Sequence, residues 1–161
     1  QGAVAGENLP PVIGWATVED GDSLVIFGRK IRMQGIDAPE ISQLCEDAAG
    51  KPWRCGAEAA WALDALVGGR EVTCQQDPRD PVDRYGRTLA LCEAGGVRLN
   101  GHMAREGWAV AYHRYLDYDD GNPRPYKAEM VAAENEARAA KRGVWRGRFD
   151  LPSLWRRAHR R

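Results

Sequence analysis

Residues 12–36 read VIGWATVEDGDSLVIFGRKIRMQGI, and this stretch decides the fold class. Three runs rich in apolar and β-branched residues, at 12–18, 23–27 and 30–36, are separated by Asp20-Gly21-Asp22 and by Gly28-Arg29. Asp-Gly between two such runs is a strong hairpin signal. The stretch therefore predicts three consecutive antiparallel strands that form a meander.

The rest of the chain adds two short strands and three helices. We expect strands at 71–75 and 88–93, a further extended piece at 108–112, and loops at 37–56 and 117–125. Apolar residues at helical spacing predict helices at about 57–67, 99–106 and 126–141, each followed by glycine. Because most strands precede the helices, the pattern predicts an α+β domain built on a small five-stranded antiparallel barrel with three helices.

Composition limits the function classes. A length of 161 residues is that of one domain, and 43% hydrophobic with 29% charged residues is typical of a folded globular protein. No run approaches the roughly 20 apolar residues that a membrane span requires. Lys and Arg number 23, as do Asp and Glu, which excludes the broad positive field of many nucleic-acid binders.

Charge is nevertheless uneven along the chain. Residues 143–161 hold six Arg and one Asp, a net +5, so residues 1–142 carry −5. We divide the chain into a flexible N-terminal lead at 1–11, a domain at 12–145 and a basic C-terminal tail at 146–161. The tail has two interpretations: a solvated basic end, or a contact for nucleic acid or an acidic partner.

The four cysteines indicate a redox compartment. Cys45, Cys55, Cys74 and Cys92 include no C-x-x-C pair, which argues against a structural zinc site. Two disulfides and four reduced thiols remain as alternatives. Of the three connectivities we favour Cys45–Cys55 and Cys74–Cys92, since the first pair brackets a polar loop and the second lies in two strand-like runs. Disulfides would place the protein in the periplasm or outside the cell.

Three polar segments carry residues suited to chemistry: Asp20-Gly21-Asp22-Ser23, the stretch RMQGIDAPE at 32–40, and DRYGR at 83–87. Each alone has a structural explanation: a hairpin turn, the start of a helix or turn, and a charged surface turn. Taken together they supply hard oxygen ligands for Ca²⁺, a carboxylate that can act on water, and two planar guanidiniums that match phosphate oxygens. Such a set fits cleavage of a phosphodiester.

The order Asp-Gly-Asp, Arg-x-x-x-x-Asp-x-Pro-Glu, Asp-x-Tyr-Gly-Arg closely resembles the thermonuclease (staphylococcal nuclease-like) family. The resemblance runs from Val12 to Trp145 and includes Leu99-Asn100, Gly107 and Gly143-Val144-Trp145. It implies an OB-type five-stranded barrel with three helices.

The resemblance also implies an activity, the Ca²⁺-dependent hydrolysis of DNA and RNA to 3′-phosphate products. Asp22 and Asp37 would be Ca²⁺ ligands together with the backbone oxygen of Ala38, and Asp20 would lie in the outer shell. Glu40 would be the general base or orient the attacking water. Arg32 and Arg87 would grip the scissile phosphate and stabilise the transition state.

Some features depart from the family pattern. Ala38 stands where the archetype has Thr, which a main-chain ligand tolerates. The resemblance places Tyr112 at the first of the family's two nucleotide-stacking tyrosines, while Tyr115 is shifted by one position from the second. The alternative for both is apolar packing of the ring with the hydroxyl exposed to water. A neutral chain predicts weaker binding to long polymers than the basic archetype.

The competing function is a non-catalytic OB-type module that binds single-stranded nucleic acid or a protein. We expect DNA or RNA as the partner, no membrane association, and a monomer.

Overall fold

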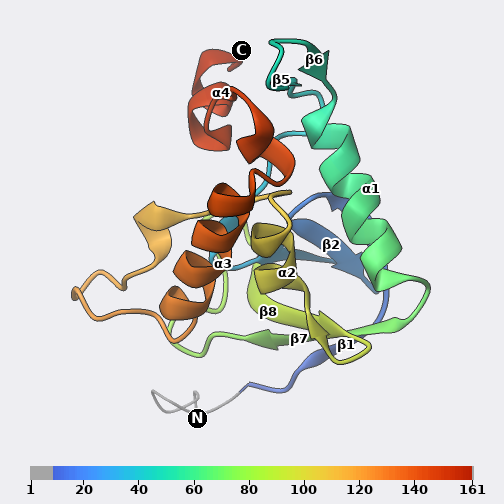
Figure 1. Ribbon diagram of the computed structural model, residues 1–161. Coiled ribbons are helices and arrows are strands. Elements are labelled where there is room, and N and C mark those ends of the chain that lie inside the picture. The colour runs from blue at the N-terminus through green and yellow to red at the C-terminus, as the bar shows by residue number, and fades with distance from the viewer. Residues whose placement is uncertain (1–8, 161) are drawn as a thin grey trace.

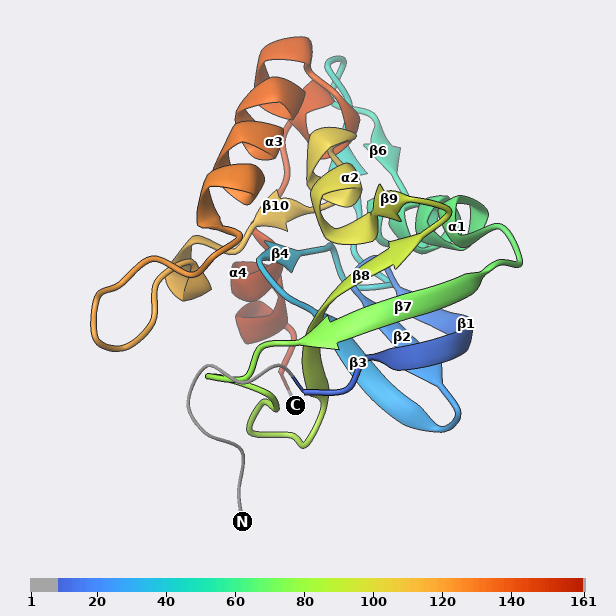
Figure 2. The ribbon, with the colours of Figure 1, turned by 90° about the horizontal axis from the view of Figure 1, so that it is seen from below.

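The computed structural model of the protein describes residues 9–160. Five strands form a closed barrel in the order β3-β2-β1-β7-β8, with β3 pairing back onto β8 (Figures 1 and 2). They are β1 (Val12–Asp20), β2 (Ser23–Ile26), β3 (Arg29–Met33), β7 (Glu71–Gln76) and β8 (Thr88–Ala94). The predicted α+β fold on an OB-type barrel is confirmed. Of the N-terminal lead predicted at 1–11, residues 1–8 lie outside the described part of the chain.

One pair of strands differs from the all-antiparallel prediction. β3 and β8 run parallel, with Ile31 opposite Thr88 and Met33 opposite Ala90. More than 50 residues, including a helix, connect these two strands, and a connection of this length allows them to run in the same direction. This parallel pair closes the barrel. Neither β3 nor β8 is therefore left as a free edge where the two strands meet.

Three helices lie where the sequence predicts them, with ends within two residues: α1 (Cys55–Val67), α2 (Leu99–Arg105) and α3 (Lys127–Ala140). Short pieces complete the fold: β4 (Ile36–Asp37), β5 (Cys45–Glu46), β6 (Pro52–Trp53), β9 (Val97–Arg98), β10 (Val110–Ala111), η1 (His113–Tyr115) and η2 (Gly143–Arg146). The segment predicted to be a basic tail contains a fourth helix, α4 (Pro152–Ala158), which begins with a proline at its first turn.

The main core fills the barrel and the space under α1, α2 and α3. Leu24, Ile26, Ile31 and Met33 are fully buried inside it. The fully buried Asn100 of α2 joins the helix to the barrel, because its side chain accepts from Cys92 N and donates to the carbonyls of Gln34 and Ala90. A second, smaller core lies at the other end of α1. It contains Cys45, Cys55, Val110 and Val144, with Trp53, Trp145 and Phe149 packed against them.

Both predicted disulfides are present, Cys45–Cys55 and Cys74–Cys92, and no free cysteine remains among residues 9–160. Cys74 and Cys92 lie directly opposite each other on the paired strands β7 and β8. Cys45–Cys55 joins β5 to the start of α1. None of the helices within residues 9–160 is both long enough and apolar enough to cross a bilayer.

Candidate active site

Two buried aspartates meet beside one guanidinium at an end of the barrel. Asp22 lies in the turn between β1 and β2, and Asp37 lies on β4, which follows β3 through a tight turn. Arg32 Nη2 lies 3.3 Å from Asp22 Oδ2 and 3.2 Å from Asp37 Oδ1. One nitrogen therefore bridges both carboxylates, which the sequence placed 15 positions apart.

The Arg32 side chain points toward the carboxylates of Asp22 and Asp37. Its neighbours on β3, Ile31 and Met33, are fully buried in the barrel core. The side chain is buried, and its Nη1 donates to the carbonyl oxygens of Met33 (2.9 Å) and Ile36 (3.0 Å). These bonds, with the two aspartates, satisfy a charge that would otherwise be costly to bury.

Burial disfavours the ionised forms of these carboxylates. Burial and the neighbouring Asp22 raise the pKa of Asp20 to about 8. Burial likewise raises the pKa of Asp37, although the surrounding arginines oppose the shift. Burial also opposes ionisation of Asp22, but the charge of Arg32 and several hydrogen bonds hold its pKa below the ordinary value. A cation bound beside these groups would favour their ionised forms.

The backbone of Ala38 lies against Asp22. Its N–H donates to Asp22 Oδ2 at 2.7 Å. Gly21 permits this approach, since a Cβ there would lie 2.8 Å from that of Ala38 and 2.9 Å from that of Ala59. The turn at residue 21 therefore needs glycine because the Cβ atoms of these two alanines come so close. The role of the Ala38 backbone oxygen as a ligand stays a prediction.

A cation is compatible with the chemistry of these donors. Among residues 9–160, no group of three or more Asp, Glu, His or Cys side chains is arranged to hold a metal ion. The expected set is smaller, with two carboxylates and one main-chain oxygen, and Asp22 and Asp37 lie close enough to share the Nη2 of Arg32. Hard oxygen donors of this kind suit Ca²⁺ when water supplies the remaining ligands.

Glu40 lies on a loop that is held tightly against α1. Its N–H donates to Gln43 Oε1 (3.2 Å), and the N–H of Gln43 donates back to the carbonyl of Glu40 (2.8 Å). A Cβ at Gly56 would lie 1.7 Å from the Glu40 carbonyl oxygen, so only glycine fits there. The Cys45–Cys55 disulfide attaches the chain just after this loop to the start of α1. The Glu40 side chain stays 31% exposed, which leaves it accessible to water.

Tyr112 and Tyr115 are both brought to the site. β10 pairs with β4, placing Val110 opposite Asp37, and Tyr112 N donates to the carbonyl of Gly35 at 2.9 Å. The Tyr112 ring centre lies 5.8 Å from the Arg32 guanidinium carbon. The Tyr115 ring packs edge-on against the Tyr112 ring, with 4.8 Å between the two ring centres. Burial and the charge of Asp37 raise the pKa of the Tyr112 hydroxyl.

Arg87 is not joined to the carboxylates by any ion pair within the described residues. Its Nε donates to Asp83 Oδ2 at 2.7 Å, inside its own loop, and its guanidinium lies 5.5 Å from the Tyr85 ring centre. Asp83 Oδ1 also accepts from the backbone N–H of Tyr85 and Arg87. Arg87 directly precedes β8, in which Leu89 pairs with Arg32, so Arg87 adjoins the strand next to that of Arg32. A role for Arg87 stays a prediction.

Two residues of the site were missed by sequence reasoning. Arg156 of α4 contacts Asp37 and Glu40, and the fully buried Gln43 holds the Glu40 loop. Pro152 could have indicated the start of a helix. No sequence signal indicates that this helix docks at residues more than 110 positions away.

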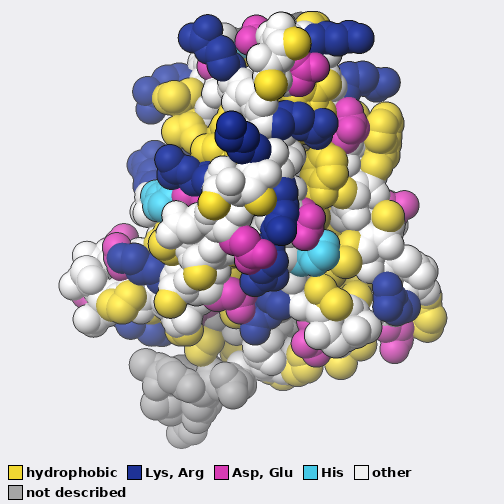
Figure 3. Space-filling view, viewed as in Figure 1, with side chains coloured by type: hydrophobic (Ala, Val, Ile, Leu, Met, Phe, Trp, Pro, Cys, Tyr) yellow, Lys and Arg dark blue, Asp and Glu magenta, His cyan; other side chains and the backbone are white. Residues whose placement is uncertain are grey.

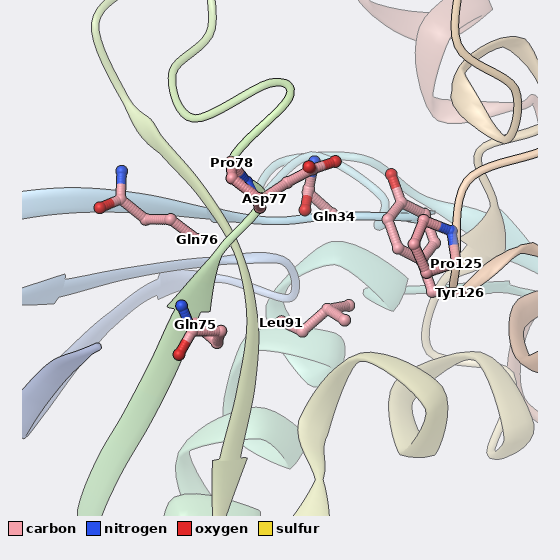
Figure 4. A pocket seen from close by; sticks show the side chains of 8 residues that line it. All are labelled: Gln34, Gln75, Gln76, Asp77, Pro78, Leu91, Pro125 and Tyr126. Atoms are coloured by element: carbon pink, nitrogen blue, oxygen red, sulfur yellow. The ribbon is translucent and has the colours of Figure 1, made fainter. Parts of the chain in front are cut away.

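A small cavity lies apart from these carboxylates. It measures about 120 Å³, and Figure 4 shows Gln34, Leu91 and Tyr126 among its lining residues. None of the carboxylates described above lines it.

Comparison with known proteins identifies the family of this chain. A family model described as staphylococcal nuclease homologue matches residues 30–147. The chain belongs to the staphylococcal nuclease family. The match includes Arg32, Asp37, Glu40 and Arg87, and it ends before α4 begins.

Curated relatives carry several names. The chain is 38% identical over 138 residues to the succinoglycan biosynthesis protein ExoI of Rhizobium meliloti, covering 84% of this chain and 65% of that protein. It is 34% identical over 153 residues to a micrococcal nuclease of Shigella flexneri, covering 86% and 76%. A thermonuclease of Staphylococcus hyicus is 28% identical over 132 residues, covering 80% and 72%. An uncharacterized protein of Bacillus anthracis is 32% identical over 133 residues, covering 80% of this chain and 58% of that protein. The chain therefore spans less than two thirds of the length of this relative and of ExoI.

Proposed function

We propose that this protein is a Ca²⁺-dependent nuclease that hydrolyses phosphodiester bonds of DNA or RNA. The observation that carries the proposal is the Arg32 guanidinium between two buried aspartates, with Glu40 on the adjoining loop. The family match and the relatives named as nucleases support it.

In the proposed reaction a water oxygen attacks phosphorus while the P–O5′ bond breaks. Glu40 takes the proton of the attacking water, and its partial exposure suits contact with that water. Arg32 and Arg87 donate hydrogen bonds to the phosphoryl oxygens, whose negative charge grows in the transition state. The 5′ oxygen leaves and gains a proton from solvent, so the other product ends in a 3′-phosphate.

Asp22, Asp37 and the backbone oxygen of Ala38 are the groups proposed to hold Ca²⁺, with Asp20 contributing through water. When bound, the ion would offset charge on the phosphoryl oxygens. Tyr112 and Tyr115 offer aromatic faces for the neighbouring nucleotides, since bases stack on such rings with little sequence preference. Two disulfides support an oxidising compartment, the periplasm or the exterior.

Incubation of labelled single-stranded and duplex DNA and of RNA with the purified protein, in Ca²⁺ or in chelator, tests the proposal. We expect cleavage only with Ca²⁺. Because the products should end in a 3′-phosphate, enzymatic addition of adenylate to their 3′ ends should succeed only after a phosphatase has removed that phosphate. Binding of an oligonucleotide without cleavage, at equal strength with and without Ca²⁺, would refute the nuclease and favour the non-catalytic OB-type module.

A further inference from the structure

Helix α4 delivers a guanidinium into the candidate site from outside the segment that matches the family. Arg156 Nη1 donates to Asp37 Oδ1 at 2.9 Å and to Glu40 Oε1 at 3.0 Å. Its Nη2 donates to Asp37 Oδ2 at 3.2 Å and to the Tyr112 hydroxyl at 3.3 Å. One side chain thus contacts three of the residues that the sequence predicts for the site.

The helix is anchored by contacts that do not involve Arg156. Gln43 Nε2 donates to the carbonyl of Asp150 (2.8 Å), and Glu46 N donates to the carbonyl of Arg148 (2.8 Å). Gly147 passes so close to residues 46–47 that a Cβ would lie 2.1 Å from the Glu46 carbonyl oxygen. Pro152 is buried. The approach of α4 is therefore built into the backbone and does not depend on attraction between a basic tail and an acidic surface.

The surroundings of α4 show what distinguishes Arg156 from the other arginines nearby. Lys and Arg side chains gather on the part of this face where α3 ends and α4 follows (Figure 3). Arg157 and Arg160 are exposed, and within the described residues neither makes a side-chain hydrogen bond or ion pair. Arg156 alone of the three points inward, with 34% of its side chain exposed.

The contacts of Arg156 fix two carboxylates relative to each other. Asp37 is almost completely buried, and Arg156 binds both of its oxygens, which sets the plane of the carboxylate. Because Nη1 is shared, the same contact holds Glu40 beside Asp37. Each carboxylate oxygen has two lone pairs, so these bonds leave acceptor capacity on Asp37.

We propose that Arg156 is a positioning residue of the site, which holds the carboxylates of Asp37 and Glu40 in the arrangement that the nuclease reaction needs. The inference rests on the proposed function and adds a residue outside the family segment. Misplacement of a reacting group by about 1 Å can cost about 100-fold in rate. Arg156 therefore acts through the two carboxylates and is expected to affect turnover more than substrate binding.

The test compares Arg156→Gln with Arg157→Gln, which removes the same charge one position along the same helix. We expect Arg156→Gln to lower kcat by about 10- to 100-fold with KM within about threefold, and Arg157→Gln to leave kcat unchanged. Millimolar guanidinium ion should restore part of the kcat of Arg156→Ala, and Arg156→Lys should be intermediate because it keeps the charge without the planar fork. Circular dichroism and thermal melting of each variant establish that it is folded.

Calcium titration by calorimetry, without substrate, gives a readout independent of turnover. We expect the Ca²⁺ dissociation constant of Arg156→Gln to stay within about threefold of the wild-type value or to increase. Tightening by tenfold or more with unchanged kcat would overturn the proposal and assign Arg156 instead as a competitor of the cation. Equal kcat for wild type and Arg156→Gln would also overturn it. A wild-type protein that cleaves nothing would refute the proposed function itself.

Discussion

Removal of the Cys45–Cys55 disulfide should impair the site more than removal of Cys74–Cys92, although the two double Ala variants should lose similar stability. The bridges close chain segments with sequence separations of 10 and 18. The loop-entropy relation then gives about 2.7 and about 3.2 kcal/mol, respectively. All four sulfur-bearing side chains are buried, so the loss of packing is also similar. For a domain of this size we expect each melting temperature to fall by about 6 to 12 °C.

The two bridges differ in what they hold. Cys74–Cys92 ties two strands that already pair along the barrel. Cys45–Cys55 attaches the chain just after the loop of Glu40 and Gln43 to the start of α1, and the Cys55 sulfur lies 3.4 Å from the Gln43 carbonyl oxygen. Cleavage rates measured at 20 °C, well below both melting temperatures, should therefore fall at least tenfold for Cys45→Ala/Cys55→Ala and less than twofold for Cys74→Ala/Cys92→Ala. Equal losses for the two variants, or full activity for the first, would refute this account of the loop.

Three further changes test the loop, the strands and the turn around the site. Asp83→Asn should lower the free energy of unfolding by about 1 kcal/mol at pH 7. Burial opposes ionisation of Asp83, but hydrogen bonds and charge from Arg87 hold its pKa below 3.8. The ionised carboxylate therefore stabilises the fold above that pH. In urea titrations, the difference in unfolding free energy between wild type and Asp83→Asn should shrink as the pH falls toward 2.5. A loss that is equal at both pH values contradicts the ion pair. Gly56→Ala places a methyl group against the Glu40 carbonyl and should lower kcat at least tenfold, whereas wild-type kcat would show that the loop yields without cost. Arg32→Met leaves two buried carboxylates without their bridging cation and should cost about 3 to 5 kcal/mol in urea unfolding at pH 7; a loss below 1 kcal/mol would contradict the burial argument.

The barrel could be predicted from the sequence because its signals are local. The Asp-Gly turn, the β-branched runs and the glycines after each helix depend on neighbours a few residues away. The parallel pairing of β3 with β8 depends on a connection of more than 50 residues, and local patterning does not encode its direction. The disulfide pairing was accessible because each pair lies in one local unit, a loop or two neighbouring strands.

The site was predictable as a set of residues but not as a network. Asp22, Arg32 and Asp37 were found by residue type and order, and the structure brings them together. Arg156 was not, because it reaches Asp37 through the docking of a helix whose sequence looks like a solvated basic end. Gln43 has neither charge nor a motif, and only its position between Glu40 and Asp150 reveals its role.

The central claim is that the residues around Asp37 perform phosphodiester hydrolysis with Glu40 as the base. Its most direct test is the single-turnover rate of an end-labelled DNA oligonucleotide in saturating Ca²⁺, for wild type and for Glu40→Gln. Glu46→Gln, at an exposed residue of the nearby strand β5, is the control. We expect Glu40→Gln to fall by at least 100-fold while Glu46→Gln keeps the wild-type rate. Cleavage by Glu40→Gln at the wild-type rate would contradict the account.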